Sequence, residues 1–236
     1  MRLLSLLVLS LALGGCVSDY TPPPALPAAA IAAPEQPARL AAENFLAVVS
    51  RVKPVAERYC RDRGVARNCD FRIVVDDRPG QPPNAFQTVD SFNRPVIGFT
   101  VALIATARNQ DELAFVLGHE AAHHVEGHIP KRKDQALSSA VLAGVLAQAS
   151  GLSPEEVKQA QSLGAEVGAR SYSKEFELQA DALGAEIALM AGYDPVRGMA
   201  FFDRLPDPGD KFLGSHPPNA ARKATVLATV RRLTGS

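Results

Sequence analysis

Apolar positions along this chain recur mostly with the spacing of helices, and one stretch carries the spacing of strands. Apolar side chains three or four positions apart share one face of a helix, whereas alternation favours a strand. Residues 40–59 show the helical spacing, although Pro54 is expected to bend the helix. The same spacing, with capping residues at the ends, predicts further helices at about residues 109–126, 153–167, 173–190 and from 218 onward.

Short segments between residues 71 and 100 carry the β-branched and aromatic side chains typical of strands. They cover residues 71–75, 84–88 and 95–100. Turn-forming residues separate the last two segments, so we expect these two to pair as a hairpin. The sequence therefore predicts an α+β fold that is mostly helical and contains a small antiparallel sheet.

Residues 136–149 form a run of alanine, leucine, valine and glycine. A membrane-spanning helix needs about 20 predominantly apolar residues. This run is shorter, and Ser138, Ser139 and Gln148 interrupt it. We therefore expect a packed helix, or one that flanks a cleft.

The first 39 residues differ in composition from the remainder of the chain. Arg2 precedes an apolar run that is typical of a secretory signal peptide, which we place at residues 1–15. Cys16 follows two glycines and resembles the lipidated cysteine of a bacterial lipobox; an ordinary signal peptide with a coincidental cysteine is the alternative. Residues 16–39 are rich in proline and alanine, which predicts an extended tether before a single domain at residues 40–236.

The cysteine count and the charge indicate the cellular compartment and the classes of partner expected for this domain. Lipidation of Cys16 leaves Cys60 and Cys69, which we expect to form a disulfide in an oxidising compartment; two free thiols are the alternative. The formal net charge is zero and the charges are scattered, which argues against nucleic acid as a partner and against membrane contact other than through the lipid. The predicted location is the periplasmic side of the bacterial envelope, at the outer membrane.

The candidate chemistry begins at His119-Glu120-Ala121-Ala122-His123, which has the His-Glu-x-x-His spacing. On a helix the two imidazoles lie one turn apart and can reach one metal ion. Glu120 projects beside that ion, where a water molecule binds, and this position suits a general base. The alternative is a helix whose histidines are merely solvated.

The residues around the motif favour a helix. Asn109 is a candidate N-cap, and Glu112 three positions later completes a capping-box pattern. Gly127 and Pro130 are expected to end the helix.

Two histidines leave a catalytic zinc site incomplete, because such sites normally have three protein ligands. His128 is nine residues from His119, so on a continuous helix it faces the opposite way and could bind only after a break. The extended motif His-x-x-Gly-x-x-His also fails, because glutamate and isoleucine stand at positions 126 and 129.

A later helix offers the missing carboxylate. Glu177 and Asp181 lie one turn apart, so Glu177 is a candidate ligand and Asp181 a candidate partner for the ring N–H of a ligand histidine. The alternative is that both acids only line a solvated helix face.

Taken together and in order, these motifs resemble the zinc metallopeptidases of the HtpX, CaaX-prenyl-protease and BepA type over roughly residues 40–236. The resemblance is carried by Asn84-Ala85-Phe86, Asp111-Glu112-Leu113, the motif at 119–123, Glu177-x-x-Ala180-Asp181 and Ser215-His216-Pro217. It implies a zincin-type domain with the sheet beside the motif helix and one zinc ion per chain. It further implies His119, His123 and Glu177 as ligands, Glu120 as catalytic base and Asp181 as the acid that orients a ligand.

The resemblance also places His216 near the metal, among the catalytic residues. His216 either stabilises the developing oxyanion or occupies the open metal position as a latch, and a structural role is the alternative. His124 and His128 are expected to support the motif helix.

The expected function is hydrolysis of peptide bonds in unfolded or misassembled envelope proteins, and the quality-control role is implied by the resemblance alone. Substrate is expected to lie extended along an edge strand near residues 96–99. The candidate residues of this substrate edge are Asn84, Ala85, Phe86, Val96, Ile97 and Gly98. Residues 87–94 replace a Gly-rich turn of the family and alter this rim. The alternative function is a lipid-anchored chaperone or binding module with a structural or latched zinc site.

Overall fold

The computed structural model describes residues 36–66, 68–171, 173–204 and 217–235. The predicted signal peptide, Cys16 and His216 lie outside this part of the chain. The first helix begins at Gln36, so its first turn occupies the end of the segment predicted as a tether.

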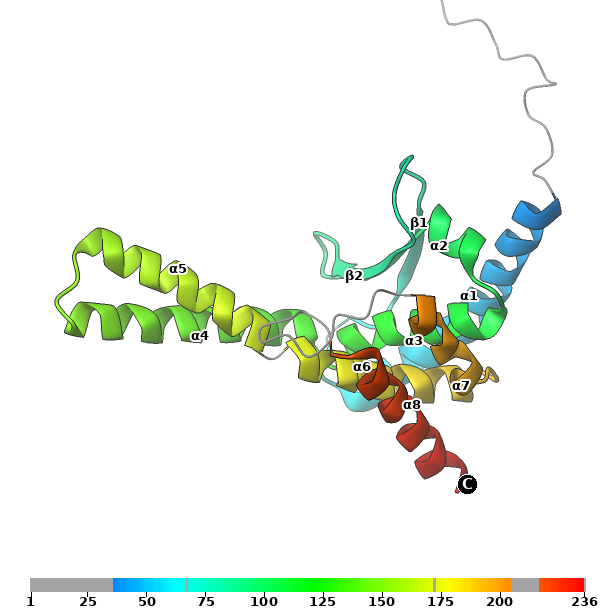
Figure 1. The fold of residues 1–236 in the computed structure, drawn as a ribbon. Helices are drawn as coiled ribbons and strands as arrows, with labels where there is room; N and C mark the ends of the chain where they lie inside the picture. The colour runs from blue at the N-terminus through cyan, green and yellow to red at the C-terminus, as the bar shows by residue number, and fades with distance from the viewer. Residues whose placement is uncertain (1–35, 67, 172, 205–216, 236) are drawn as a thin grey trace, which may run out of the picture. The chain divides into compact units, whose positions relative to one another are not determined.

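The fold is mostly helical with a small sheet, as predicted (Figure 1). The helices are α1 (Gln36–Arg63), α2 (Val101–Thr106), α3 (Gln110–Val125), α4 (His128–Ala149), α5 (Pro154–Ser171), α6 (Ser173–Met190), α7 (Pro195–Gly198) and α8 (Asn219–Thr234), with a 3-10 helix at Met199–Arg204. The strands are β1 (Arg72–Asp76), β2 (Ala85–Val89) and β3 (Pro95–Thr100).

The sheet is mixed, which corrects the prediction of an antiparallel sheet. Its strand order is β1-β3-β2, with β2 antiparallel and β1 parallel to the central strand β3. The predicted hairpin of β2 and β3 is confirmed. The chain leaves β1, forms β2 two strand positions away, and returns as β3 into the position between them, parallel to β1.

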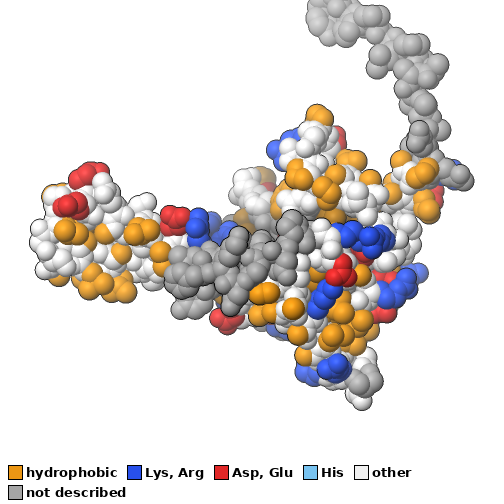
Figure 2. Space-filling view, viewed as in Figure 1, with side chains coloured by type: hydrophobic (Ala, Val, Ile, Leu, Met, Phe, Trp, Pro, Cys, Tyr) orange, Lys and Arg blue, Asp and Glu red, His pale blue; other side chains and the backbone are white. Residues whose placement is uncertain are grey.

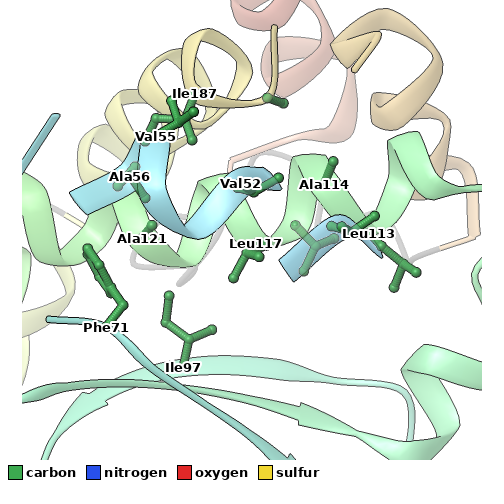
Figure 3. Close-up of a cluster of buried hydrophobic side chains, with 14 of the residues drawn as sticks. Val52, Val55, Ala56, Phe71, Ile97, Leu113, Ala114, Leu117, Ala121 and Ile187 are labelled. Atoms are coloured by element: carbon green, nitrogen blue, oxygen red, sulfur yellow. The ribbon is translucent and has the colours of Figure 1, made fainter. Parts of the chain in front are cut away.

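The core lies where α1, α6 and the sheet pack around the motif helix α3. Buried side chains of α3 face Phe71 and Ile97 on the sheet side. Ile187 of α6 belongs to the same cluster and lies beside Val55 of α1 (Figure 3). Twelve of the sixteen residues of α3 are buried, which explains why its sequence is apolar nearly all round.

Helices α3 and α6 approach so closely that two glycines face each other. A Cβ atom added to Gly118 would lie 2.6 Å from the carbonyl oxygen of Gly184, and one added to Gly184 would lie 2.6 Å from the backbone nitrogen of His119. Only glycine permits this contact between the two backbones. The contact fixes the two ligand-bearing helices relative to each other.

Helices α4 and α5 pack mainly against each other as a two-helix hairpin (Figure 1). The apolar run at residues 136–149 is helical as predicted, but several of its side chains are exposed, and Figure 2 shows hydrophobic side chains on this hairpin. The exposed ones are Leu137, Val141, Leu142, Val145 and Leu146. Of the helices in the described ranges, none combines the length and apolarity that a bilayer crossing requires.

Candidate metal centre

The motif helix α3 begins as the sequence predicts. Asn109 is the N-cap, and its side chain accepts a hydrogen bond of 3.0 Å from the backbone N–H of Glu112. The Glu112 carboxylate accepts in return from the backbone N–H of Arg108 and forms a bidentate pair with Arg204, at 2.7 Å for each bond. Glu112 is 1% exposed, so this pair compensates a buried negative charge at the start of the helix.

Helix α3 ends where the sequence predicts, but His128 does not lie where a continuous helix would place it. Gly127 ends the helix as expected, with φ of 67°, a left-handed conformation suited to glycine. Pro130 does not act as a stop but lies in the first turn of the next helix, α4, which begins at His128. Because the helix breaks at Gly127, His128 does not face away, and its Nδ1 lies 2.9 Å from Nδ1 of His123.

The structure brings the three predicted ligands together from α3 and α6. The Nε2 atoms of His119 and His123 are 3.1 Å apart, and the Glu177 carboxylate oxygens lie 3.5 Å from the first and 3.4 Å from the second. Tetrahedral zinc with bonds of about 2.0–2.1 Å separates neighbouring donor atoms by about 3.3 Å. Two imidazoles and one carboxylate at these distances therefore fit a zinc ion.

His119 is oriented by a buried ion pair. Its Nδ1 donates to the Asp181 carboxylate at 2.9 Å, which leaves Nε2 directed at the metal position. Arg222, from α8, donates two bonds of 2.7 Å to Asp181 and lies 4.0 Å from the centre of the Phe202 ring. Asp181 is 0% and Arg222 7% exposed, so the two buried charges compensate each other, with smaller contributions from His119 beside Asp181 and from Glu177 beside Arg222.

His123 has a different support. Its Nδ1 meets His128, whose Nε2 lies 3.1 Å from the side-chain oxygen of Gln179 on α6. The His128 ring stacks on Phe176, with ring centroids 4.5 Å apart and planes inclined by 13°. The predicted supporting role of His128 thus has a specific partner, the ligand His123.

The pKa values of the metal-free site are consistent with a site that binds a cation. Burial alone would lower the pKa of His119, but the hydrogen bonds and negative charges of Asp181 and Glu177 outweigh it and raise the pKa to about 10. Burial raises the pKa of the Glu120 carboxyl, against the opposing effect of the two histidines. Burial lowers the pKa of His128 to about 4, so its imidazole is neutral at pH 7.

A cavity of about 340 Å³ opens beside the predicted ligands. Glu120 lines it, as expected for a base that works next to the metal. Its other lining residues include Asn84, Ala85, Phe115, His119, Glu177, Phe202 and Arg222. A second groove, of about 640 Å³, lies beyond His123 and is lined partly by Gln87, Val89, Phe92 and Ile129.

The substrate edge needs a correction. Residues 96–98 belong to β3, which is hydrogen-bonded on both sides, so Val96, Ile97 and Gly98 cannot offer a free edge. Among the described strands β1 and β2 both have an open side, and β2 is the one beside the cavity: it contains Ala85 and Phe86 and directly follows Asn84. The sequence identified both strands, but it does not reveal which of them lies in the centre of the sheet.

The open edge of β2 can be assigned residue by residue. The backbone N–H of Thr100 donates to the carbonyl of Asn84, and the N–H of Asp90 donates to the carbonyl of Arg94. In an antiparallel pair the bonded positions alternate, so Asn84, Phe86 and Thr88 bond to β3. The N–H and carbonyl groups of Ala85, Gln87 and Val89 therefore point to the open side. Ala85 lines the first cavity, whereas Gln87 and Val89 line the second.

The remaining predicted residues fall outside this site. Cys60 and Cys69 form the expected disulfide, between the end of α1 and the residues before β1. His124 hydrogen-bonds to the backbone carbonyl of Asn68 at 2.7 Å and packs edge-on against the Phe71 ring, which supports α3.

Sequence reasoning missed Arg222 and Gln179. Arg222 lies in the first turn of α8, where a positive charge opposes the helix dipole, and this unfavourable position was a usable signal of a buried acidic partner. No pattern in the sequence distinguishes Gln179 from other polar residues of its helix.

Comparison with known proteins agrees with this geometry. The model of peptidase family M48 matches residues 48–230. The mitochondrial metalloendopeptidase OMA1 of Arabidopsis thaliana is 28% identical over 146 residues, which are 59% of this chain and 29% of that protein. A putative beta-barrel assembly-enhancing protease of Vibrio cholerae is 24% identical over 157 residues, 59% of this chain and 32% of that protein.

The beta-barrel assembly-enhancing protease of Escherichia coli is 27% identical over 113 residues, 45% of this chain and 23% of that protein. The chain thus spans less than a third of the length of each of these relatives.

Proposed function

This chain belongs to peptidase family M48, and from that premise we propose that it is a zinc-dependent endopeptidase acting on unfolded or misassembled proteins of the bacterial cell envelope. The observation that carries the proposal is the convergence of His119, His123 and Glu177 with donor separations of 3.1–3.5 Å. Glu120 lies in the adjoining cavity.

His119, His123 and Glu177 are the residues that would hold the zinc ion. When bound there, zinc supplies a Lewis acid that polarises the scissile carbonyl and lowers the pKa of a water molecule towards about 7. The Nδ1 atoms of both histidines are engaged by other side chains, which directs both Nε2 atoms towards the metal position.

Glu120 acts as the base and then as the acid. Its carboxylate takes a proton from the attacking water, whose oxygen forms a bond to the carbonyl carbon. The same carboxyl group returns that proton to the nitrogen of the leaving amine as the C–N bond breaks. The pKa of Glu120 is raised by burial, which brings its proton affinity closer to that needed for both transfers at neutral pH.

The open edge of β2 supports a preference for extended, unfolded chains. A peptide added antiparallel to β2 can hydrogen-bond to Ala85, Gln87 and Val89 through main-chain groups alone. Such a peptide would run from the cavity that contains Glu120 to the groove beyond His123. A scissile bond in the interior of a folded domain cannot reach this edge without unfolding, so recognition depends on an unfolded backbone.

The envelope location is part of the proposal. It draws on the lipobox-like sequence ending at Cys16 and on the names of two relatives, which are beta-barrel assembly-enhancing proteases. In this arrangement lipidated Cys16 tethers the peptidase domain to the outer membrane, on its periplasmic side.

The test compares the wild-type protein with Glu120→Gln. We expect wild type to bind one zinc ion and to cleave casein, an unfolded substrate, while sparing a stably folded protein of similar size. Glu120→Gln should keep its zinc, by elemental analysis, and lose roughly 10²–10⁴-fold in rate.

Two results would count against the proposal. A fully active Glu120→Gln variant would refute the assignment of the base. Zinc-loaded wild type that binds unfolded casein without cleaving it would favour the alternative of a chaperone or binding module.

A further inference from the structure

We propose that His128 is a positioning residue for the metal site, which fixes the tautomer and ring orientation of His123 and thereby raises the affinity for zinc. The inference rests on the metal site of the proposed function. It assigns a role to a histidine that touches a ligand but not the metal position.

His128 is the middle member of a continuous hydrogen-bonded chain. Its Nδ1 lies 2.9 Å from Nδ1 of His123, and its Nε2 lies 3.1 Å from Oε1 of Gln179. The amide nitrogen of Gln179 in turn donates to the Glu175 carboxylate at 3.0 Å. The chain therefore runs from a metal ligand on α3, through the start of α4, to the surface of α6.

The donor and acceptor of each hydrogen bond in this series can be assigned by starting from the Glu175 carboxylate. A carboxylate only accepts, so the NH₂ group of Gln179 faces Glu175 and its carbonyl oxygen faces His128. That oxygen also only accepts, so Nε2 of His128 carries the proton and Nδ1 is left as an acceptor. His123 must then donate from its own Nδ1.

The assigned direction selects the form of His123 that binds a cation. A neutral imidazole with its proton on Nδ1 presents an unprotonated Nε2, and Nε2 is the atom near His119 and Glu177. The other tautomer would place a proton at the metal position. Partners of this kind on ligand histidines typically change metal affinity by 10–100-fold.

The ring of His128 is itself held in place. It is 4% exposed and stacks on Phe176, and the left-handed backbone of Gly127 directs the chain so that the ring lies beside His123. The acceptor atom is thus fixed by packing before any metal binds.

The experiment measures zinc affinity by competition with a chelator, in wild type and in His128→Leu. Zinc affinity is expected to fall by about 10–100-fold in His128→Leu. His128→Asn is the conservative variant, because its side-chain oxygen occupies a position close to that of Nδ1 and accepts a hydrogen bond. It should recover most of the lost affinity.

His124→Leu is the matched control. His124 is the neighbouring histidine, but its ring nitrogen hydrogen-bonds to the backbone carbonyl of Asn68 and not to a metal ligand. We expect its loss to change the thermal unfolding of the metal-free protein and to leave the zinc affinity unchanged. Visible absorption of the Co²⁺-loaded proteins gives an independent readout, which should be altered in His128→Leu and unaltered in His124→Leu.

Gln179→Met provides a second variant should His128→Leu fail to fold. It removes the acceptor that sets the tautomer of His128 and should reduce zinc affinity in the same direction. Equal zinc affinities in wild type, His128→Leu and Gln179→Met would overturn the inference while leaving the proposed function intact. Absence of zinc binding by wild type would instead overturn the proposed metal site.

Discussion

The two histidine ligands on α3 are oriented by supports of opposite character. His119 donates to Asp181, a fully buried carboxylate that is itself held by the buried cation Arg222. His123 donates to the neutral ring of His128, which is held by an amide and by stacking on Phe176. The task is the same, the presentation of Nε2 to a cation, but the first support is charged and the second is not.

This difference separates folding from metal binding. A buried ion pair contributes most visibly when one partner is removed, because the remaining charge is then uncompensated. Removing a member of the neutral hydrogen-bonded series from His123 to Gln179 leaves no uncompensated charge. Its main effect is on the tautomer and orientation of the ligand His123. We therefore expect the His119 support to govern the stability of the domain and the His123 support to govern metal affinity.

The largest effect should come from Arg222→Ala, which leaves Asp181 buried without its cation. We expect the free energy of unfolding of the metal-free protein to fall by about 3–5 kcal/mol, measured by denaturant titration.

The matched variants for this prediction are Asp181→Ala and the double substitution. Because each single change strands the other charge, the double variant should lose much less than the two single losses combined. Additive losses would show that the two side chains do not act as a pair.

A smaller effect is expected from Phe176→Leu, which removes the ring stacked on His128. Loss of the aromatic contact and of some buried volume should lower the free energy of unfolding by about 1–2 kcal/mol. Zinc affinity should also fall, because His128 is free to rotate away from His123. A loss of stability with unchanged zinc affinity would show that stacking has no part in positioning the ring.

The effect that separates the two supports most clearly is on the pH dependence of stability. The raised pKa of His119 stabilises the metal-free fold below pH 6.5, and this contribution is lost as pH rises from 6.5 to about 10. The lowered pKa of His128 has the opposite sign, so its contribution is present above pH 6.5 and is lost as pH falls towards about 4.

Thermal unfolding of the metal-free protein, recorded from pH 4 to 10, tests both signs. Asp181→Asn should flatten the loss on the alkaline side, and His128→Asn should reduce the loss on the acidic side. Identical profiles in wild type and both variants would contradict the assignment of these groups.

The sequence predicts the helices and the donor set of this domain because those features depend on local spacing. His119 and His123 are one turn apart on any helix, and the cap formed by Asn109 and Glu112 involves residues three positions apart. The choice of Glu177 needed a second helix, but its spacing from Asp181 gave the sequence a usable pattern.

Features that depend on how distant segments meet were not accessible in this way. Alternation identifies β2 and β3 as strands but carries no information on which is central, so the open edge was assigned to the wrong strand. His128 was expected to support the motif helix, but its contact with His123 was not predicted, because its position was judged on a continuous helix although Gly127 indicated a stop.

The glycine contact between α3 and α6 has a further consequence for the life of the protein. Gly118 and Gly184 bring the two helices backbone against backbone, a contact that does not involve the metal-ligand side chains. Removal of the cation should therefore leave the arrangement of the ligands intact, so that zinc can bind again directly. A domain built in this way should release and rebind its metal without passing through an unfolded state.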